Sequence, residues 1–488
     1  MQSQNSNMQT VQQYDSVIRD IADYVLDETI ESEAAFDIAR YCIMDTLGCG
    51  FLALKFPECT KHIGPIVPGT IVPGGARVPG TNFIQDPVKS AWDIGCIIRW
   101  LDFNDTWLAQ EWGHPSDNLG AILACTDYVS QLNISKGEAP LKMRAVLEAM
   151  IKAHEIQGVI ALQNSFNQVG LDHVLLVRVA STAVAAKILG ANKEQMCAAI
   201  SQAWVDGCSL RTYRHAPNAG SRKSWAAGDA TSRAVHLALM SIKGEMGIPT
   251  VLSTPQWGYY DILFKGNSFV IEQPYSSYVM ENILFKLSFP AEFHAQTACE
   301  AAIKLHLSVK NKLDAIDRID IDTHISAIRI IVKDGDLHNP ADRDHCLQYM
   351  VAVPLIFGDL KAEHYSDAFH NENPIIDTIR EKMHITENER YSKEYLDSDK
   401  RSIANAIKIT FKDGTSTERI EVEYPIGHKR RREEGKKVLL QKFNKSIHAH
   451  FETTQCDTIE ALFENQKQFE ELNVNDFVNH FTLKNNAF

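Results

Sequence analysis

One short segment of the chain gathers side chains that could carry out acid–base chemistry. The residues from Asp102 to Asn118 include carboxylates, amides, a threonine hydroxyl and a histidine, with tryptophans among them. Tryptophan shields a site from water, while Asp, Thr and His side chains supply oriented hydrogen bonds and a group that titrates near neutral pH. The segment is therefore a candidate catalytic site.

The spacing alone leaves two structural interpretations of this segment open. Asp102 and Thr106 are four residues apart, so they share one face if the local backbone is helical. Alternatively, Ser116 and Asp117 form a cap and a turn between two core helices and have no catalytic role.

The segment lies within a long region that is expected to be helical. From Tyr14 to about Met280 apolar residues recur three and four positions apart, as they do from Ala34 to Cys42, and strand patterns are scarce. The Gly- and Pro-rich stretch from Pro65 to Pro79 interrupts this pattern and is expected to be a long surface loop.

Beyond Phe285 the pattern becomes mixed. Residues 319–324 alternate in polarity, and so do residues 406–411, which lead through a turn at 412–414 into a second run at 419–423. This order indicates a hairpin. Helix-like stretches lie at 299–306 and 344–353, and the chain returns to a helical pattern after Gly427.

These patterns predict a mainly α fold with a smaller α+β second domain. We expect a large all-helical domain from residues 1–283 and 427–488, with an α+β lid domain, residues 284–426, inserted into it. The length of 488 residues favours two domains. A cleft between them is the expected place for a ligand.

The composition restricts the partners and the compartment. The formal net charge of -13 disfavours binding to nucleic acid or to an anionic membrane, and the basic run from Lys429 to Arg432 is expected to be a solvated helix start. The apolar stretch from Val174 to Gly190 contains Arg178 and Lys187, so we expect a buried helix there. The polar residues 1–15 lack the pattern of a secretory signal or a transit peptide, which favours a cytoplasmic protein.

The cysteines argue against a metal centre. The chain has ten, with no Cys-x-x-Cys pair and no cluster near histidines. This distribution is unlike that of a zinc site, a disulfide framework or an iron–sulfur protein. We therefore expect a reducing compartment, no metal and no cofactor.

Four stretches of the sequence closely resemble the MmgE/PrpD family. They are residues 100–118, 222–230 (RKSWAAGDA), 285–296 (FKLSFPAEFHAQ) and 339–350 (NPADRDHCLQYM), so the resemblance extends over essentially the whole chain. The family implies a helical domain, a smaller α+β lid domain and a homodimer. It also implies a hydro-lyase that dehydrates 2-methylcitrate to 2-methyl-cis-aconitate in propionate catabolism, with citrate as a second substrate to be tested.

The resemblance implies a set of active-site residues. The positions that match the family's pocket are Asp102, Thr106, His114, His173, Lys223, Lys286 and Tyr349. Related cis-aconitate decarboxylases carry histidines where this sequence has Glu292 and Gln296, and their loop before the position of His114 is shorter. These departures favour a dehydratase over a decarboxylase.

Dehydration places clear demands on such a pocket. A base must take a proton from a carbon next to a carboxylate while other groups stabilise the charge that builds there, and an acid must protonate the leaving hydroxide. Without a cysteine set for an iron–sulfur Lewis acid, side chains must do this work. The three carboxylates of the substrate also need basic partners. The residues assigned to hold them are Lys223, Lys286, Arg222, Arg343 and His294.

These demands lead to a hypothesis about roles. His114 or Asp102 moves the proton on carbon, and Tyr349 or His173 assists the leaving hydroxyl. Structural alternatives exist for the last two, since His173 precedes an apolar helix that it could cap, and Tyr349 could bridge core and surface.

Two other functions remain open. Within the same family, the chain could be a cis-aconitate decarboxylase or another lyase or epimerase of dicarboxylates or tricarboxylates. In a different class, it could be a non-catalytic helical interaction protein, although the density of ionisable groups beside tryptophans argues against this. The expected partners are a small tricarboxylate and a second copy of the chain.

Overall fold

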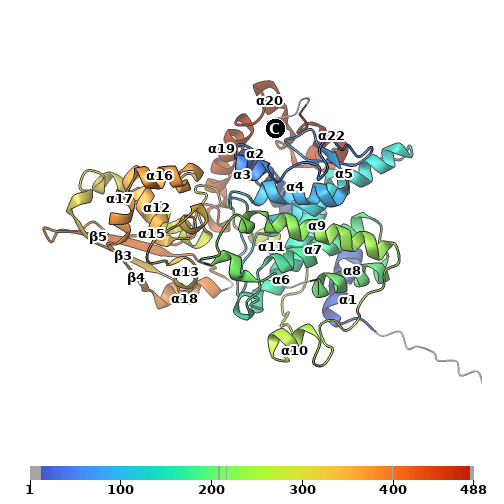
Figure 1. Ribbon diagram of the computed structural model, residues 1–488, viewed down its shortest axis with the longest axis horizontal. Helices are drawn as coiled ribbons and strands as arrows, with labels where there is room; N and C mark the ends of the chain where they lie inside the picture. Colours follow the sequence, from blue (N-terminus) through green and yellow to red (C-terminus); the bar gives the residue numbers. More distant parts are fainter. Residues whose placement is uncertain (1–12, 207–208, 216, 398, 484–488) are drawn as a thin grey trace, which may run out of the picture.

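The computed structural model describes residues 13–206, 209–215, 217–397 and 399–483, and it divides into a helical part and a mixed part (Figure 1). Most buried apolar side chains form two large clusters, one from residues 17–287 and 439–481 and the other from residues 289–422. We call the elements around the first cluster the helical body and those around the second the α+β unit. The prediction of a mainly α fold with a small α+β part is confirmed.

The helical body is built from both ends of the chain. Its N-terminal elements are α1 (Ser16–Asp27), α2 (Glu33–Ala53), α3 (Pro57–Thr60), α4 (Pro87–Arg99), α5 (Leu119–Ser135), α6 (Met143–Gln163), α7 (Val174–Ile188), α8 (Lys193–Val205), α9 (Arg222–Ile242), α10 (Tyr259–Phe264) and α11 (Tyr278–Asn282). The C-terminal ones are α19 (Arg432–His448), α20 (Thr453–Leu462), α21 (Gln466–Glu471) and α22 (Val474–Asn479). The apolar stretch after His173 is the buried helix α7, as predicted.

Helices α4 and α9 pack in very close contact. This contact brings the C-terminal end of α4 close to the N-terminal end of α9. A Cβ atom at Gly95 would lie 2.7 Å from Cα of Gly228, so only glycine permits this approach. Helix α4 starts at Pro87, where the Asp86 side chain accepts from the backbone amides of the first turn, and it ends at Arg99. The start of α9 carries Lys223.

The α+β unit has a four-stranded sheet in the order β4-β3-β5-β6. Its strands are β3 (Ile316–Thr323), β4 (Met383–Glu387), β5 (Asn405–Phe411) and β6 (Ile420–Val422). The predicted hairpin is the antiparallel pair β5 and β6, while β3 runs antiparallel to β5 and parallel to β4. The helices of the unit are α12 (Gln296–Val309), α13 (Ile325–Ile331), α14 (Pro340–Arg343), α15 (Leu347–Phe357), α16 (Asp367–Glu372), α17 (Ile375–Arg380) and α18 (Glu389–Leu396).

The two connections between the body and the unit are joined to each other. The Phe285 amide donates to the Gly427 carbonyl at 3.1 Å. A Cβ atom at position 427 would lie 1.7 Å from the carbonyl oxygen of Phe285, so glycine is required at this crossing. Phe285 and Leu287 still pack into the first core, so the chain leaves the body after Leu287.

Two expectations differ in detail from the structure. The stretch from Pro65 to Pro79 is mostly loop but contains the short strand β1 (Ala76–Arg77), which pairs antiparallel with β2 (Ile84–Gln85). The Asp127 carboxylate accepts from the amide and the guanidinium of Arg77 and holds this strand against the body. The residues from Asp102 to Thr106 are not helical, and Asp102 has a φ of 49°. They therefore do not share a helix face.

The cysteines form no disulfide bonds within the described ranges. The cysteines within the described ranges are free and buried, and Cys208 lies outside these ranges, as do residues 1–12. Among the described helices, none has both the length and the apolar character that a membrane crossing requires.

Candidate active site

A small polar pocket lies where the body meets the α+β unit. Its walls come from the loop that follows α4, from the short 3-10 helix Arg211–Arg214, from the segment 286–292 and from the α+β unit. The lining residues are Arg99, Asp102, Thr106, Leu108, Trp112, His114, His173, Arg211, Arg214, Lys286, Glu292, Ile330 and His345. The free volume is about 20 Å³, which leaves room for about one water molecule.

Two pairs of antiparallel backbone hydrogen bonds fix the conformation of the loop between α4 and α5, residues 100–118. Thr106 exchanges backbone hydrogen bonds with Leu284, at 2.8 and 3.1 Å. Trp107 does the same with Gly113, at 2.8 and 3.0 Å. The loop then turns through the 3-10 helix Pro115–Asn118 into α5. These contacts place the side chains of Asp102, Thr106 and His114 on the pocket wall.

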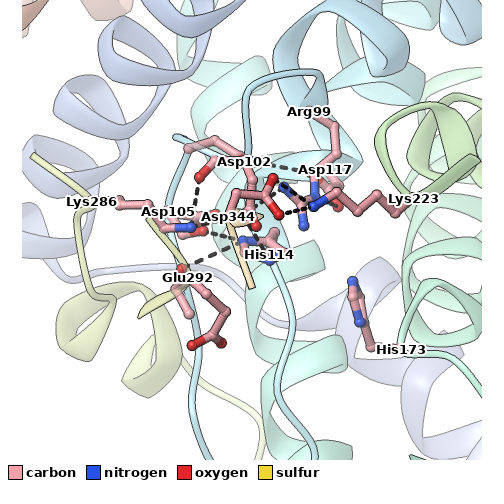
Figure 2. A network of polar contacts seen from close by, with 12 residues as sticks. Arg99, Asp102, Asp105, His114, Asp117, His173, Lys223, Lys286, Glu292 and Asp344 are labelled. Carbon is pink, nitrogen blue, oxygen red and sulfur yellow. Dashed lines mark hydrogen bonds and ion pairs between the residues drawn. The ribbon is translucent and has the colours of Figure 1, made fainter. Parts of the chain in front are cut away.

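Asp102 is the centre of the ionic network (Figure 2). Its Oδ1 accepts from Arg99 Nη1 and from Lys286 Nζ, each at 2.7 Å, and Lys286 also donates to its backbone carbonyl at 2.6 Å. Burial alone would raise the pKa of Asp102, but the charges of Arg99 and Lys286 hold that pKa well below its usual range. Asp102 is therefore a permanent anion that anchors two cations.

His114 has one ring nitrogen committed and one turned toward the network. Nδ1 lies 2.6 Å from the Asp105 carbonyl oxygen, which can only accept, so Nδ1 carries the proton. Nε2 lies 3.6 Å from Asp102 Oδ1. Burial, followed by the charge of Arg99, holds the pKa of His114 well below its usual value, although Asp102 acts in the opposite direction. The ring is thus neutral at pH 7, and its Nε2 lone pair is available as a base.

His173 and two arginines form the opposite wall. Asp172 accepts from Arg214 Nε and, at 3.0 Å, from Arg214 Nη2, while Arg211 Nη1 lies 3.6 Å away from it. Burial holds the pKa of His173 well below its usual value, and neither of its ring nitrogens has a hydrogen-bond partner among the described residues, although Nδ1 lies 3.5 Å from Asp172 Oδ1. Arg211 Nη1 likewise has no hydrogen-bond partner within the described part of the chain. Unpartnered buried polar atoms of this kind are ready to receive a polar ligand.

Lys223 joins the body to the α+β unit. Its ammonium donates to both oxygens of the Asp344 carboxylate, at 2.5 Å for Oδ2, and lies 3.2 Å from Nδ1 of His345. His345 Nδ1 is 2.8 Å from Asp344 Oδ1, and its Nε2 is 4.0 Å from Asp102 Oδ2. Burial lowers the pKa of Lys223, although Asp344 opposes this. The ammonium itself lies behind His345 rather than on the pocket wall.

Glu292 and His294 form a separate buried pair at the edge of the pocket. Glu292 accepts from the amide of His294 at 2.9 Å and lies 2.8 Å from its Nδ1, and His294 Nε2 is 3.0 Å from the hydroxyl of Tyr395. Burial would raise the pKa of Glu292, but His294 lowers it. Glu292 lines the pocket, whereas His294 lies behind it.

Three of the residues predicted from the sequence lie away from the pocket. The Tyr349 hydroxyl donates to the His364 carbonyl at 2.7 Å, inside the second core. Arg343 is buried, donates to the Tyr365 carbonyl at 2.7 Å and pairs with Asp367. Arg222 is half-exposed and stacks on Trp225, 4.3 Å from the ring centroid. The structure thus gives Tyr349 and Arg343 structural contacts within the α+β unit.

Several pocket residues were not identified from the sequence. The pair Arg211 and Arg214 belongs to a short turn whose only signal is two basic residues three apart. Arg99 and His345 also line the pocket, and His345 lies within the motif at 339–350. The apolar residues Leu108, Trp112 and Ile330 complete the wall. Their roles depend on tertiary contacts that no spacing rule displays.

Comparison with known proteins identifies clear relatives. Residues 19–272 match the MmgE/PrpD N-terminal domain, and residues 289–468 match the MmgE/PrpD C-terminal domain. The 2-methylcitrate dehydratase of Escherichia coli (strain K12) is 57% identical over 474 residues, 96% of this chain and 98% of the relative. That of Cupriavidus necator is 58% identical over 473 residues, 96% and 97% of the two chains. The mitochondrial 2-methylcitrate dehydratase of Yarrowia lipolytica is 56% identical over 474 residues, 96% and 91%.

Proposed function

This chain belongs to the MmgE/PrpD family, and we infer that it is a hydro-lyase that converts 2-methylcitrate to 2-methyl-cis-aconitate. The observation that carries this inference is the identity of more than half of the residues, over 96% of the chain, to relatives that bear the name of this activity. The pocket supports it because, among the described lining residues, four basic side chains, Arg99, Arg211, Arg214 and Lys286, outnumber the two carboxylates, Asp102 and Glu292, although Asp172 behind the wall pairs with Arg214. This balance suits a substrate with three carboxylates.

We propose that the carboxylates of the substrate bind between two cationic walls. Arg99 and Lys286 are fixed by Asp102 on one side, and on the other Arg211 Nη1 lies 3.6 Å from Asp172 with no hydrogen bond to any described residue. The charge that builds on the carboxylate next to the reacting carbon is stabilised by groups already in position, which lowers the barrier without reorganisation. In this scheme Arg211 takes the role that sequence reasoning assigned to Arg343.

We propose that His114 is the base. Its Nε2 takes the proton from the carbon beside the carboxylate, the electron pair of the C–H bond forms the C=C bond, and the C–O bond to the hydroxyl breaks. The neutral state of His114 and the fixed proton on its Nδ1 suit this role. Asp102 is less suited, because a carboxylate held by two cations has little affinity for a proton.

The leaving hydroxyl needs a proton, and we propose that His345 supplies it. Its Nε2 faces Asp102 across the pocket, while Asp344 and Lys223 surround its Nδ1. Burial and the charge of Lys223 lower the pKa of His345 in the substrate-free protein, and a bound trianion opposes this because it adds negative charge beside the ring and favours the imidazolium. The unpartnered nitrogens of His173 would orient the same hydroxyl. Tyr349 is not needed for this step, since its hydroxyl is bonded elsewhere.

We propose that the 2-methyl group packs against Leu108, Trp112 and Ile330, the apolar part of the lining. Leu108 and Trp112 belong to one small apolar cluster, and Arg211 stacks on the ring of Trp112 at 4.9 Å from its centroid. A methyl group buried in such a wall contributes about 1 kcal/mol to binding or catalysis. Citrate lacks this contact, so we expect it to be a poorer substrate.

We propose that residues 284–426 act as a lid domain over the rest of the chain, residues 1–283 and 427–488, and that the moving part is the α+β unit beyond Leu287, because Phe285 and Leu287 pack into the core of the body. The pocket in this structure is too small for a tricarboxylate, so the α+β unit must move to admit the substrate and must close around it in a wider arrangement than the one seen here. The Lys223–Asp344 pair would break and reform as the lid opens and closes. We further propose that the protein is cytoplasmic, forms a homodimer, binds no nucleic acid and needs no metal or cofactor.

Product analysis tests the proposed activity. Purified protein should convert 2-methylcitrate to 2-methyl-cis-aconitate without release of carbon dioxide, with citrate and cis-aconitate supplied separately as comparisons. Decarboxylation of cis-aconitate in place of dehydration would identify a different member of the family. Activity that is lost with a chelator and restored with iron would contradict the role given to the side chains.

A further inference from the structure

A buried group of side chains lies directly beneath the catalytic loop and does not line the pocket. It consists of Cys42 on α2, Asp105 on the loop and His154 on α6, all fully buried. Cys42 Sγ lies 3.7 Å from Asp105 Oδ2 and 3.7 Å from His154 Nε2. The acid–base mechanism above uses none of the three, although Asp105 is the residue whose carbonyl holds His114.

The hydrogen bonds of His154 require a proton between its ring and Asp105. His154 Nδ1 lies 2.8 Å from the Met150 carbonyl oxygen, which can only accept, so Nδ1 carries a proton. His154 Nε2 lies 2.8 Å from Asp105 Oδ2. A neutral ring would place a bare nitrogen against a bare carboxylate, so a second proton must lie on this contact. Two donors of Ser116 on Asp105 Oδ1 favour the carboxylate form of Asp105, so the pair is a buried imidazolium beside a carboxylate.

Asp105 links His154 to the part of the loop that contains His114 and Ser116. Its Oδ1 accepts from the Ser116 hydroxyl at 2.6 Å and from the Ser116 amide at 3.0 Å. Its backbone carbonyl accepts from His114 Nδ1 at 2.6 Å. The side chain therefore fixes the residues just after His114, while the main chain of the same residue fixes the ring of His114.

We propose that His154 is a positioning residue that, through Asp105, holds the loop so that Nε2 of His114 points into the pocket. A carboxylate that bridges a charged ring and two Ser116 donors cannot rotate without leaving a buried donor unsatisfied. The proposal rests on the proposed function only in the role that it gives to His114.

A metal ion is a weaker explanation of the same three side chains. Two ligands of one tetrahedral zinc ion, a nitrogen and an oxygen each about 2.1 Å from the metal, lie about 3.3 Å apart. The 2.8 Å between His154 Nε2 and Asp105 Oδ2 is a hydrogen-bond distance. The cluster therefore fits a proton better than a metal.

Two substitutions and one spectrum test the proposal. His154→Gln keeps a donor but loses the charge, and we expect kcat for 2-methylcitrate to fall about a hundredfold with little change in KM, because a displaced base loses rate more than affinity. Asp105→Asn keeps the contacts to Ser116 and can donate to a neutral His154, so we expect a smaller loss of kcat. The matched control is His450→Gln, since His450 also bonds a carbonyl, that of Gly80, far from the pocket; its kcat should not change.

Nitrogen-15 NMR of labelled histidine in the substrate-free protein separates this proposal from the activity. We expect one ring with protons on both nitrogens that exchange slowly, assigned by its loss in His154→Gln, and a His114 ring protonated at Nδ1. In the variant His114 should lose that single tautomer. A His154 ring protonated at one nitrogen only, tight zinc binding to the purified protein, or an unchanged kcat in a folded His154→Gln variant would each overturn the proposal.

Discussion

The Lys223 ammonium and the Asp344 carboxylate form a buried ion pair across the boundary between the helical body and the α+β unit. Removing one partner leaves the other charge buried and unpaired, which typically costs about 3–5 kcal/mol. We therefore expect Asp344→Asn to lower the free energy of unfolding by several kcal/mol in urea titrations. The double variant Lys223→Met with Asp344→Leu removes both charges and should recover much of that loss; an equally unstable double variant would contradict this explanation.

His114 should be required for turnover and should set the acid limb of the pH profile. We expect His114→Gln to lower kcat by about 10²–10⁴-fold, the usual contribution of a general base. Because the base must be neutral and its pKa is held well below 6.5, kcat/KM should stay high at pH 6.5 and fall only at lower pH. A profile whose acid limb is centred above pH 6.5 would argue for a different base.

The buried neutral histidines also predict how stability depends on pH. The pKa values of His114, His173 and His324 are lowered in the folded protein, chiefly by burial, whereas the unfolded chain takes up these protons near pH 6.5. Their contribution to stability is therefore complete above pH 6.5 and is lost as pH falls from there toward the lowered values. Thermal unfolding from pH 7.5 to 5 should show a falling melting temperature, and His324→Gln should make the fall less steep.

The apolar wall should decide between substrates that differ by one methyl group. We expect Ile330→Ala to lower kcat/KM for 2-methylcitrate by up to about fivefold and to change that for citrate much less, because only the first substrate has a methyl group to bury. Ile328→Ala, on the same helix α13 but outside the pocket lining, is the matched control and should change neither. An equal loss for both substrates would place the methyl group elsewhere.

Arg211 should contribute to substrate binding through Nη1, which makes no hydrogen bond to the described residues. Arg211→Lys keeps the charge but loses the planar donor geometry, so we expect KM for 2-methylcitrate to rise about tenfold or more. Arg222→Lys, at a half-exposed position that stacks on Trp225, should leave KM unchanged. The reverse ranking of these two variants would support the assignment of Arg222 that sequence reasoning favoured.

The sequence was sufficient to predict the fold class and one wall of the pocket, because periodicity and local motifs are short-range signals. The alternation at 406–411 led directly to the hairpin, and the cluster around His114 lies on the pocket wall. The positions of Arg343 and Tyr349 could not be foreseen, since they share a motif with His345 yet point into the core of the α+β unit. Which way a side chain points within a motif is decided by contacts distant in the sequence, as with Arg343 and the carbonyl of Tyr365.

Lys442 on α19 fixes the backbone next to Asp102 and the backbone of Lys286 to the helical body. Its ammonium pairs with Asp45 and donates to the carbonyls of Phe103 and Lys286, at 2.7 and 2.8 Å. Phe103 follows Asp102 directly, so this one side chain holds the backbone on both sides of the Asp102–Lys286 contact. If the α+β unit swings away beyond Leu287, as proposed above, these groups would stay with the body, while Glu292, Ile330, Asp344 and His345 would leave with the unit. The open enzyme would then present a pre-assembled half-site that captures the anion first, and closure would deliver the proton donor and the methyl contact last.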